Sequence, residues 1–326
     1  MGTIECLLCG NKAQIVEQNY PGYKEPDRFS ICNCSFCNTQ FSYPRVETAQ
    51  LYEFIYQHAD IVPGYDRYYK YKNVVKSIKH PLKYLSDCEE AYWAINDALK
   101  YDSKNKDKLK ILEVGCGMGY LTYSIHEEGF NILGLDISHG AIEEAINNFG
   151  EYYICTDVFS YSSEHKEEYD RIILTQVIEH VEDPVKWMRA LSFMLKKGGK
   201  IIVTTENKTI FPNDVIWQSD LPPVHLWWFS EQSMQYIADQ IGAALYFTNF
   251  SKYNTDVMGR FISPIDYNQH RIFKDGRIQV IENSQSKLRN IIKSIPFAKY
   301  IYRKYINPFD IIFDKRRFTM GAIFIK

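Results

Sequence analysis

The chain has 326 residues, of which 45% are hydrophobic and 24% charged, and its formal net charge is −2. This composition is typical of a globular protein with one large domain or two smaller ones. The near-neutral charge argues against nucleic acid as the main partner, because neutralising many phosphates requires a basic surface. No apolar run is long enough to span a membrane and no signal peptide is visible, so we expect a cytoplasmic protein whose eight cysteines are thiols or metal ligands.

Residues 1–45 contain two C-x-x-C knuckles, formed by Cys6, Cys9, Cys34 and Cys37. Thiolates three residues apart around a tight turn can bind the same metal ion, and two such pairs complete a tetrahedral site. A closed site of four thiolates predicts a structural zinc ion in a ribbon-like segment, with a hairpin around Pro21–Gly22 between the knuckles. Two alternatives stay open: Cys32 replaces Cys34 as a ligand, or the cysteines are buried free thiols.

Residues 46–107 show apolar residues at helical spacing and many aromatic residues. A turn signal at Pro63–Gly64 precedes a tyrosine-rich run over residues 65–71. This run is either a lid over a ligand site or a set of half-buried tyrosines that join two helices. The polar stretch from Lys100 to Lys108 predicts a domain boundary.

Five nearly continuous apolar runs alternate with segments of helical periodicity between residues 108 and 250. The runs are Lys110–Val114, Asn131–Leu135, Tyr152–Cys155, Arg171–Leu174 and Lys200–Thr204. Such runs are typical of strands that are covered on both faces, so we expect an α/β doubly wound parallel sheet. Asp183–Pro184 predicts the start of a helix, and Gly198–Gly199 predicts its end. A later helix is expected from Ser230 to Gly242, and a strand is expected after it at Tyr246–Asn249.

Residues 251–316 carry weak signals, which include a helix expected around Gln285–Ile292 and a basic, aromatic run over residues 299–305. Such a run can bind nucleic acid or a membrane surface, but a solvated helix face is the commoner outcome. The chain ends with an apolar run at Phe318–Ile325. We therefore interpret residues 251–316 as an insertion and residues 317–326 as the last strand of the sheet.

A glycine-rich turn follows the first strand of this sheet, with Gly115, Gly117 and Gly119 at alternate positions. Glycine there permits positive φ and lets a ligand approach the backbone closely. Ligands of open parallel sheets bind beyond the carboxyl ends of the strands. Those ends carry a series of polar residues, namely Glu113, Asp136, Asp157 and Gln176.

This series of polar residues predicts a nucleoside site. Asp136 lies about 20 residues beyond the glycines, where a carboxylate can accept both ribose hydroxyls. Asp157 can accept from an adenine amino group while Val158 and Phe159 cover the ring. The alternative for each acid is a helix N-cap.

The ligand at the turn is better matched by a cationic adenosine than by a dinucleotide. The dinucleotide pattern G-x-G-x-x-G is not met, because position 120 is Tyr120. Glu113 also places a carboxylate beside the turn, where a pyrophosphate would be repelled and an ammonium group attracted. These features disfavour a nicotinamide-dependent oxidoreductase.

The segment Leu112–Gly119 resembles the first motif of the class I S-adenosylmethionine-dependent methyltransferases. Two more segments are similar to this family: Leu135–Ser138 to its ribose motif, and Val177–Pro184 to the segment after its fourth strand. The resemblance implies a Rossmann-like sheet of seven strands whose final strand is antiparallel. It also implies that S-adenosylmethionine is bound by Glu113, Gly115, Cys116, Gly117, Gly119, Tyr120, Asp136, Ile137, Asp157, Val158 and Gln176. The cysteine-rich N-terminus and the segment Pro222–Ser230 look like bacterial members that modify sugars or glycans.

The resemblance predicts methyl transfer to a small-molecule or glycan-precursor acceptor, at a hydroxyl that needs a base. His225, after a Pro-Pro turn, is the first candidate for the base, and His180, which can also cap a helix, is the second. Trp227, Trp228 and Phe229 form either a platform for the acceptor or an apolar staple at a helix start. The alternatives are a methyltransferase of ribosomal or transfer RNA that recognises RNA through the ribbon, and a non-catalytic cofactor-binding module. The acceptor, the methylated atom and the oligomeric state stay open.

Overall fold

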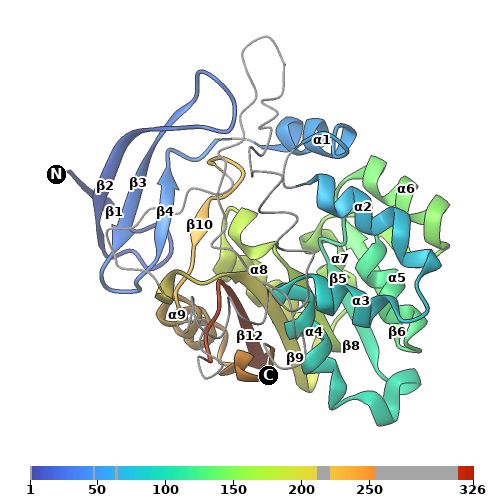
Figure 1. The fold of residues 1–326 in the computed structure, drawn as a ribbon. Coiled ribbons are helices and arrows are strands. Elements are labelled where there is room, and N and C mark those ends of the chain that lie inside the picture. Colours follow the sequence, from blue (N-terminus) through green and yellow to red (C-terminus); the bar gives the residue numbers. More distant parts are fainter. Residues whose placement is uncertain (1, 47, 63–64, 211–220, 254–314) are drawn as a thin grey trace, which may run out of the picture.

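The computed structural model describes residues 2–46, 48–62, 65–210, 221–253 and 315–326. Figure 1 shows a blue antiparallel sheet on one side of the molecule, and helices α2 to α6 on the opposite side of the central sheet. The helix expected around Gln285–Ile292 and the basic, aromatic run at residues 299–305 lie outside the described residues. Among the described residues, none of the helices combines the length and the apolar character needed to cross a membrane.

The N-terminal sheet has five strands in the order β1-β2-β3-β4-β10. Its strands are β1 (Thr3–Glu5), β2 (Lys12–Pro21), β3 (Arg28–Cys34), β4 (Gln40–Tyr43) and β10 (Trp227–Trp228). The turn between β2 and β3 is closed by a hydrogen bond from Gly22 N to Asp27 O, which confirms the expected hairpin. Strand β10 comes from a distant part of the chain and places Trp227 opposite Phe41. The cysteine-rich segment is therefore joined to the rest of the protein through its own sheet.

Four helices follow, as the helical pattern of residues 46–107 predicts. They are α1 (Ala49–Gln57), α2 (Asp66–Val74), α3 (Pro81–Cys88) and α4 (Glu90–Lys100). Helix α3 begins with Pro81, whose missing N–H is not needed at the first helical position. Helices α3 and α4 bury Leu85 and Ile95 against one face of the central sheet.

The central sheet has seven strands in the order β11-β12-β9-β8-β5-β6-β7. The strands are β5 (Lys110–Val114), β6 (Asn131–Asp136), β7 (Tyr153–Cys155), β8 (Tyr169–Thr175), β9 (Leu195–Glu206), β11 (Ala244–Phe247) and β12 (Thr319–Ile325). Strands β5 to β9 are parallel, whereas β12 runs antiparallel to both of its neighbours. The expected doubly wound sheet with an antiparallel last strand is confirmed.

Five further helices cover the two faces of this sheet. They are α5 (Tyr120–Glu127), α6 (His139–Phe149), α7 (Val158–Glu164), α8 (Pro184–Met194) and α9 (Glu231–Ile241). The predicted end of α8 at Gly198–Gly199 is wrong, because the helix ends at Met194 and β9 begins at once with Leu195. Leu195 is buried and pairs with Tyr169 of β8, so tertiary contacts end the helix before the glycines.

Neighbouring residues of β5, β6, β8 and β9 contribute to two different cores. Leu112 of β5 packs with α8 and α9 on one face, and Ile111 packs with α3 to α6 on the other. This alternation explains the nearly continuous apolar runs of the sequence. The first core also includes Phe41 and the buried knuckle cysteines, so the N-terminal sheet and the central sheet share one hydrophobic cluster.

Candidate cofactor and metal sites

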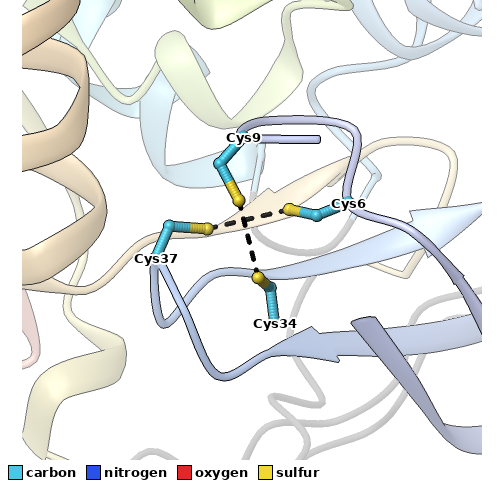
Figure 2. A group of neighbouring side chains, drawn as sticks. All are labelled: Cys6, Cys9, Cys34 and Cys37. Atoms are coloured by element: carbon cyan, nitrogen blue, oxygen red, sulfur yellow. Dashed lines mark hydrogen bonds between the residues drawn. The ribbon is translucent and has the colours of Figure 1, made fainter. Parts of the chain in front are cut away.

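The four cysteines of the two knuckles form one cluster, in which the sulfur atoms point toward a common centre (Figure 2). The Sγ atoms of Cys6 and Cys37 lie 3.7 Å apart, and those of Cys9 and Cys34 lie 3.6 Å apart. These distances are too long for disulfides. With zinc–sulfur bonds of about 2.3 Å, the edge of a tetrahedral site is about 3.8 Å, so the donor set fits a zinc ion.

Cys32 lies on β3 opposite Phe41 and is not one of the four clustered cysteines. Burial raises the pKa of its thiol to about 11, with Arg45 acting in the opposite direction. The buried thiol packs as a small apolar group, whereas the Sγ atom of Cys34 lies in the cluster of four. The structure therefore favours Cys34 over Cys32 as the fourth ligand.

The second knuckle is anchored on the central domain. Ser233 of α9 donates from Oγ to Cys37 O at 3.1 Å and lies 2.6 Å from Thr39 Oγ1. Lys208, which is buried after β9, donates from Nζ to Asn38 Oδ1 at 2.7 Å. A zinc ion with four thiolates carries a net negative charge, which a nearby ammonium group helps to balance.

The glycine-rich turn is held against the end of β6. Gly115 N donates to Leu135 O at 2.7 Å, and Gly117 N donates to Asp136 Oδ2 at 2.8 Å. Asp136 is only 6% exposed and accepts from Ser138 N through its other oxygen at 2.9 Å. The carboxylate thus stands rigidly beside the turn, and each oxygen keeps a lone pair for a further donor such as a ribose hydroxyl.

These bonds also bear on the choice of ligand. A pyrophosphate at a glycine-rich turn needs backbone N–H groups that point outward. Here the N–H groups of Gly115 and Gly117 are bonded to Leu135 and Asp136. The turn is consequently a poorer anion site than the dinucleotide pattern requires, in line with the argument from Tyr120.

Glu113 lies at the end of β5 and is 2% exposed. Its Oε2 accepts a hydrogen bond from Thr122 Oγ1. Burial raises the pKa of this carboxyl group to about 8, and the bond from Thr122 opposes the rise. The side chain is therefore mainly neutral at pH 7 in the absence of a cation, and its charge depends on what binds beside it.

Three of the predicted cofactor-binding residues follow β6 and β7, and two of them, Asp157 and Val158, were expected to bind adenine. Ile137 is 75% exposed, so its apolar side chain is available to cover a ring. Asp157 caps α7 and accepts from Phe159 N and Ser160 N through Oδ1. The N-cap reading of Asp157 is thus realised, while Oδ2 can still face a ligand. Val158 is buried in the core, so the expectation that its side chain covers the adenine ring is not met.

Three other predicted cofactor residues differ in their roles. Cys116 and Tyr120 are buried in the core, and Tyr120 Oη lies 2.5 Å from Tyr92 Oη. Both can meet a ligand only through their backbones. Gln176 at the end of β8 has φ of 55° and a buried Nε2 with no hydrogen-bond partner among the described residues. An orphaned buried amide is costly, and a bound ligand is one way to satisfy it.

Helix α1 contacts the glycine-rich turn through Tyr56. A Cβ atom added at Gly117 would lie 3.3 Å from Tyr56 Oη, and Gly117 has φ of +50°. Of the two alternatives for the tyrosine-rich run, the structure favours half-buried tyrosines: Tyr68 and Tyr71 contact the ring of Tyr120, at the start of α5. The helix that lies over the turn is therefore α1, outside the run at residues 65–71.

The two candidate catalytic histidines lie side by side, with ring centroids 4.7 Å apart. His180 ends the short 3-10 helix η3 (Ile178–His180), and His225 precedes β10. Nδ1 of His180 lies 2.6 Å from Val224 O and 2.9 Å from Tyr52 Oη. Because a carbonyl oxygen only accepts, Nδ1 carries the proton and Nε2 keeps its lone pair.

The aromatic platform next to His225 is not present in the structure. Trp227, Trp228 and Phe229 are all at most 1% exposed. Trp227 donates from Nε1 to Val181 O at 2.7 Å and lies in β10 opposite Phe41. The prediction of a platform is wrong, because β10 completes the N-terminal sheet and draws these rings into the core.

Several side chains at the site had no role in the sequence-based prediction. Glu179 lies beside His180 within a motif that the sequence makes visible, but only the fold shows that it is fully buried. Glu206 ends β9 and has Oε1 3.6 Å from His225 Nδ1. Tyr52 and Tyr56 share one face of α1, since they are four residues apart. The helix itself was expected from its apolar spacing, whereas nothing local indicated this tyrosine face or its neighbours.

Comparison with known proteins adds sequence similarity to this geometry. Residues 89–246, just under half of the chain, match the family model described as "Methyltransferase domain". The chain is 32% identical over 104 residues to the "Ubiquinone biosynthesis O-methyltransferase" of Yersinia pestis (strain Pestoides F). That alignment covers 30% of this chain and 43% of the relative, so the similarity spans less than half the length of the curated protein.

Solved structures resemble the chain more distantly. The SAM-dependent methyltransferase of Thermotoga maritima, described as a possible histamine N-methyltransferase, is 14% identical with a TM-score of 0.47, over 84% of this chain and 99% of that one. A SAM-dependent methyltransferase from Archaeoglobus fulgidus is 15% identical with a TM-score of 0.44, over 71% and 93%. Because these scores are low, the fold class rests on the strand order itself. The match over residues 89–246 and this topology together support a methyltransferase domain of the class that uses S-adenosylmethionine.

Proposed function

We propose that this protein transfers the methyl group of S-adenosylmethionine to a hydroxyl group of a small molecule or glycan precursor. The observation that carries the proposal is the placement of Asp136, which is buried beside Gly117 and bonded to it through a carboxylate oxygen. This arrangement suits a ribose whose adenosine lies along the ends of β5 and β6. The match to a methyltransferase domain and a relative named as an O-methyltransferase support the same reaction and a hydroxyl acceptor.

Each part of the cofactor has a candidate partner in the chain. Asp136 would hold the ribose hydroxyls, and exposed Ile137 would cover the adenine ring. Glu113, at the end of β5, would face the ammonium group of the methionine part, which would favour its ionised form. When bound, S-adenosylmethionine supplies a methyl group that is already activated by its sulfonium. The work left to the protein is alignment of the acceptor and exclusion of water.

The acceptor would lie between the cofactor and the two histidines. Tyr56 lies near Gly117 and Tyr52 lies near His180, on one face of α1. Four residues of helix correspond to a rise of about 6 Å, so the two regions are adjacent. A hydroxyl must lose its proton to become a good nucleophile. His225 is the first candidate for the group that takes up this proton, and His180 is the second.

The zinc ion that we assign to Cys6, Cys9, Cys34 and Cys37 is structural. It would hold the two knuckles together and thereby keep β3 and β4 in place against β10. Four thiolates leave no position for a substrate.

Cofactor binding tests the proposed function. Asp136→Ala removes both ribose contacts, and charge-assisted hydrogen bonds contribute about 1.5–3 kcal/mol each, so we expect S-adenosylmethionine affinity to fall at least about 100-fold. Asp136→Asn separates loss of charge from loss of shape, and Asp107→Ala, at an exposed position, is the control. Calorimetry on the folded variants gives the affinities. Equal affinity in wild type and both Asp136 variants would refute the assignment.

The acceptor class is tested by S-adenosylhomocysteine formation. We expect turnover with members of panels of phenols, alcohols and nucleotide sugars, and none with ribosomal or transfer RNA. Turnover on RNA alone would establish the RNA alternative instead. Retained cofactor binding without turnover on any panel would support a non-catalytic binding module.

A further inference from the structure

Glu179, His180 and His225 form a second cluster of potential metal ligands, far in sequence from the cysteines. Each offers one ligand atom, and these atoms all lie within 4.8 Å of one another. Glu179 is fully buried, His225 is 3% exposed and His180 is half-buried. The cluster thus brings a carboxylate and two imidazoles together inside the protein, at the carboxyl ends of β8 and β9.

The ligand set indicates the kind of ion. Metal ions of the zinc type bind imidazole nitrogen and carboxylate oxygen at about 2.0–2.2 Å, so ligands of one ion are about 3–3.6 Å apart. The three ligand atoms, which all lie within 4.8 Å of one another, would have to approach by at most about 1–2 Å to reach this spacing. Two imidazoles and one carboxylate favour a divalent transition metal over Mg²⁺ or Ca²⁺, and leave positions open for a substrate.

The groups around the histidines fit metal coordination. Histidines that bind a metal commonly donate their other ring N–H to a carbonyl or a carboxylate. His180 does so through Nδ1 to Val224 O at 2.6 Å, with Tyr52 Oη donating to the same carbonyl at 2.8 Å. For His225, the carboxylate of Glu206 lies 3.6 Å from Nδ1. His180 therefore has an outer partner of the expected type, and His225 has a carboxylate near its ring.

The backbone fixes the two segments that carry these ligands. Leu226 N donates to Glu179 O at 2.9 Å, and Trp227 Nε1 donates to Val181 O at 2.7 Å. The residues next to His225 are thus bonded to the residues next to His180. A cluster on rigid, buried segments loses little entropy when it binds an ion.

A cation at this position also agrees with the local charge. Two carboxylates, Glu179 and Glu206, lie close to the paired rings and are mostly or fully removed from water. One of these carboxylates belongs to the cluster itself, and the other lies beside His225. A divalent ion held by the three ligands supplies two positive charges where the carboxylates converge.

From this geometry we infer that Glu179, His180 and His225 bind a divalent transition-metal ion, of which Zn²⁺ is the best match, and that this ion binds the acceptor hydroxyl. The second part rests on the proposed function. A hydroxyl bound to such an ion loses its proton to solvent more readily, because the cation stabilises the alkoxide or phenolate. The two histidines then act as ligands, and neither has to act as the base.

Binding of Mn²⁺ tests the site directly, because Mn²⁺ prefers oxygen and nitrogen ligands and competes poorly for four thiolates. The full chain, with zinc in the cysteine site, is titrated with Mn²⁺ and followed by electron paramagnetic resonance. We expect one Mn²⁺ per chain. Glu179→Gln and His225→Gln, which keep the side-chain size, should each weaken binding at least tenfold. His139→Ala is the matched control, since His139 and Glu143 form an exposed pair on α6.

Three readouts separate the outcomes. Wild-type Mn²⁺ affinity in both variants, with unchanged circular dichroism, would overturn the metal site. A methyl-transfer rate that is the same with and without the ion would overturn its role on the acceptor. Absence of S-adenosylmethionine binding in the wild type, together with one Mn²⁺ per chain, would refute the proposed function and leave the metal site standing.

Discussion

The buried carboxyl group of Glu113 predicts a pH dependence that can be assigned to a single side chain. Burial raises its pKa from the usual 4.5 to about 8. Between these values the folded protein keeps a proton that the unfolded chain has lost. Stability is therefore fully present below about pH 4.5, falls as the pH rises, and levels off above about pH 8.

The size of the effect follows from the same two values. Each pH unit between them corresponds to about 1.4 kcal/mol, so the contribution of Glu113 to the free energy of unfolding decreases by at most about 5 kcal/mol across the window. Glu113→Gln keeps the shape and the contact with Thr122 but cannot ionise. Because other groups also titrate, the quantity to compare is the difference between wild type and this variant.

Urea denaturation of both proteins from pH 5 to pH 8.5 measures this difference. We expect the wild type to lose several kcal/mol more than Glu113→Gln as the pH rises. The cofactor adds a second readout, because an ammonium group next to Glu113 favours the carboxylate. Binding of S-adenosylmethionine at pH 6.5 should release nearly one proton from the wild type, measured by calorimetry in two buffers of different ionisation enthalpy. Parallel stability curves and equal proton release in both proteins would show that Glu113 does not titrate as the structure implies.

Two further predictions concern the knuckles and the glycine-rich turn. In metal analysis, Cys34→Ala should lose one zinc ion per chain, whereas Cys32→Ala should retain it, since Cys32 lies outside the cluster of four. Loss of zinc only in Cys32→Ala would reverse the assignment of the fourth ligand. Gly119→Ala should lower the free energy of unfolding by more than about 2 kcal/mol in thermal denaturation, because φ is +78° and the new Cβ would lie 2.7 Å from both Ala145 Cβ and the ring of Tyr153. Gly129 is the control, because its φ is +90° and no atom lies within 4 Å of an added Cβ. Gly129→Ala should therefore lower the free energy of unfolding only by the backbone strain, about 1–2 kcal/mol. An equal decrease in both variants would mean that packing at Gly119 is unimportant.

The elements that local chemistry specifies were predictable from the sequence. The strand Lys110–Val114 was expected with the bounds that the structure has, because a strand covered on both faces must be apolar throughout. Helix α9 is capped by Ser230 and Gly242, as the preferences of helix ends predict. The end of α8 was misplaced, because the pairing of Leu195 with β8 outweighs the turn preference of two glycines.

The candidate cofactor site was largely predictable for a related reason. In a parallel sheet, all carboxyl ends lie at one edge, so Glu113 and Asp136 could be placed together from strand order alone. The protonation, orientation and hydrogen bonds of the side chains at this edge could not be predicted from strand order. That Glu113 is mainly protonated, that Val158 faces the core and that Asp157 caps a helix depend on burial and on local hydrogen bonds.

By itself, the sequence determined the parallel sheet, the glycine-rich turn with its acids, and the two cysteine knuckles, because each of these leaves a local pattern in the chain: apolar runs, alternate glycines and C-x-x-C pairs. Only the tertiary structure decided that β10 completes the N-terminal sheet, that Tyr56 of α1 lies over Gly117, and that Glu179 meets His225. These contacts join residues that are 46 to 188 positions apart in the chain. Local periodicity contains no information about such pairs, since they form only when separate apolar surfaces pack against each other.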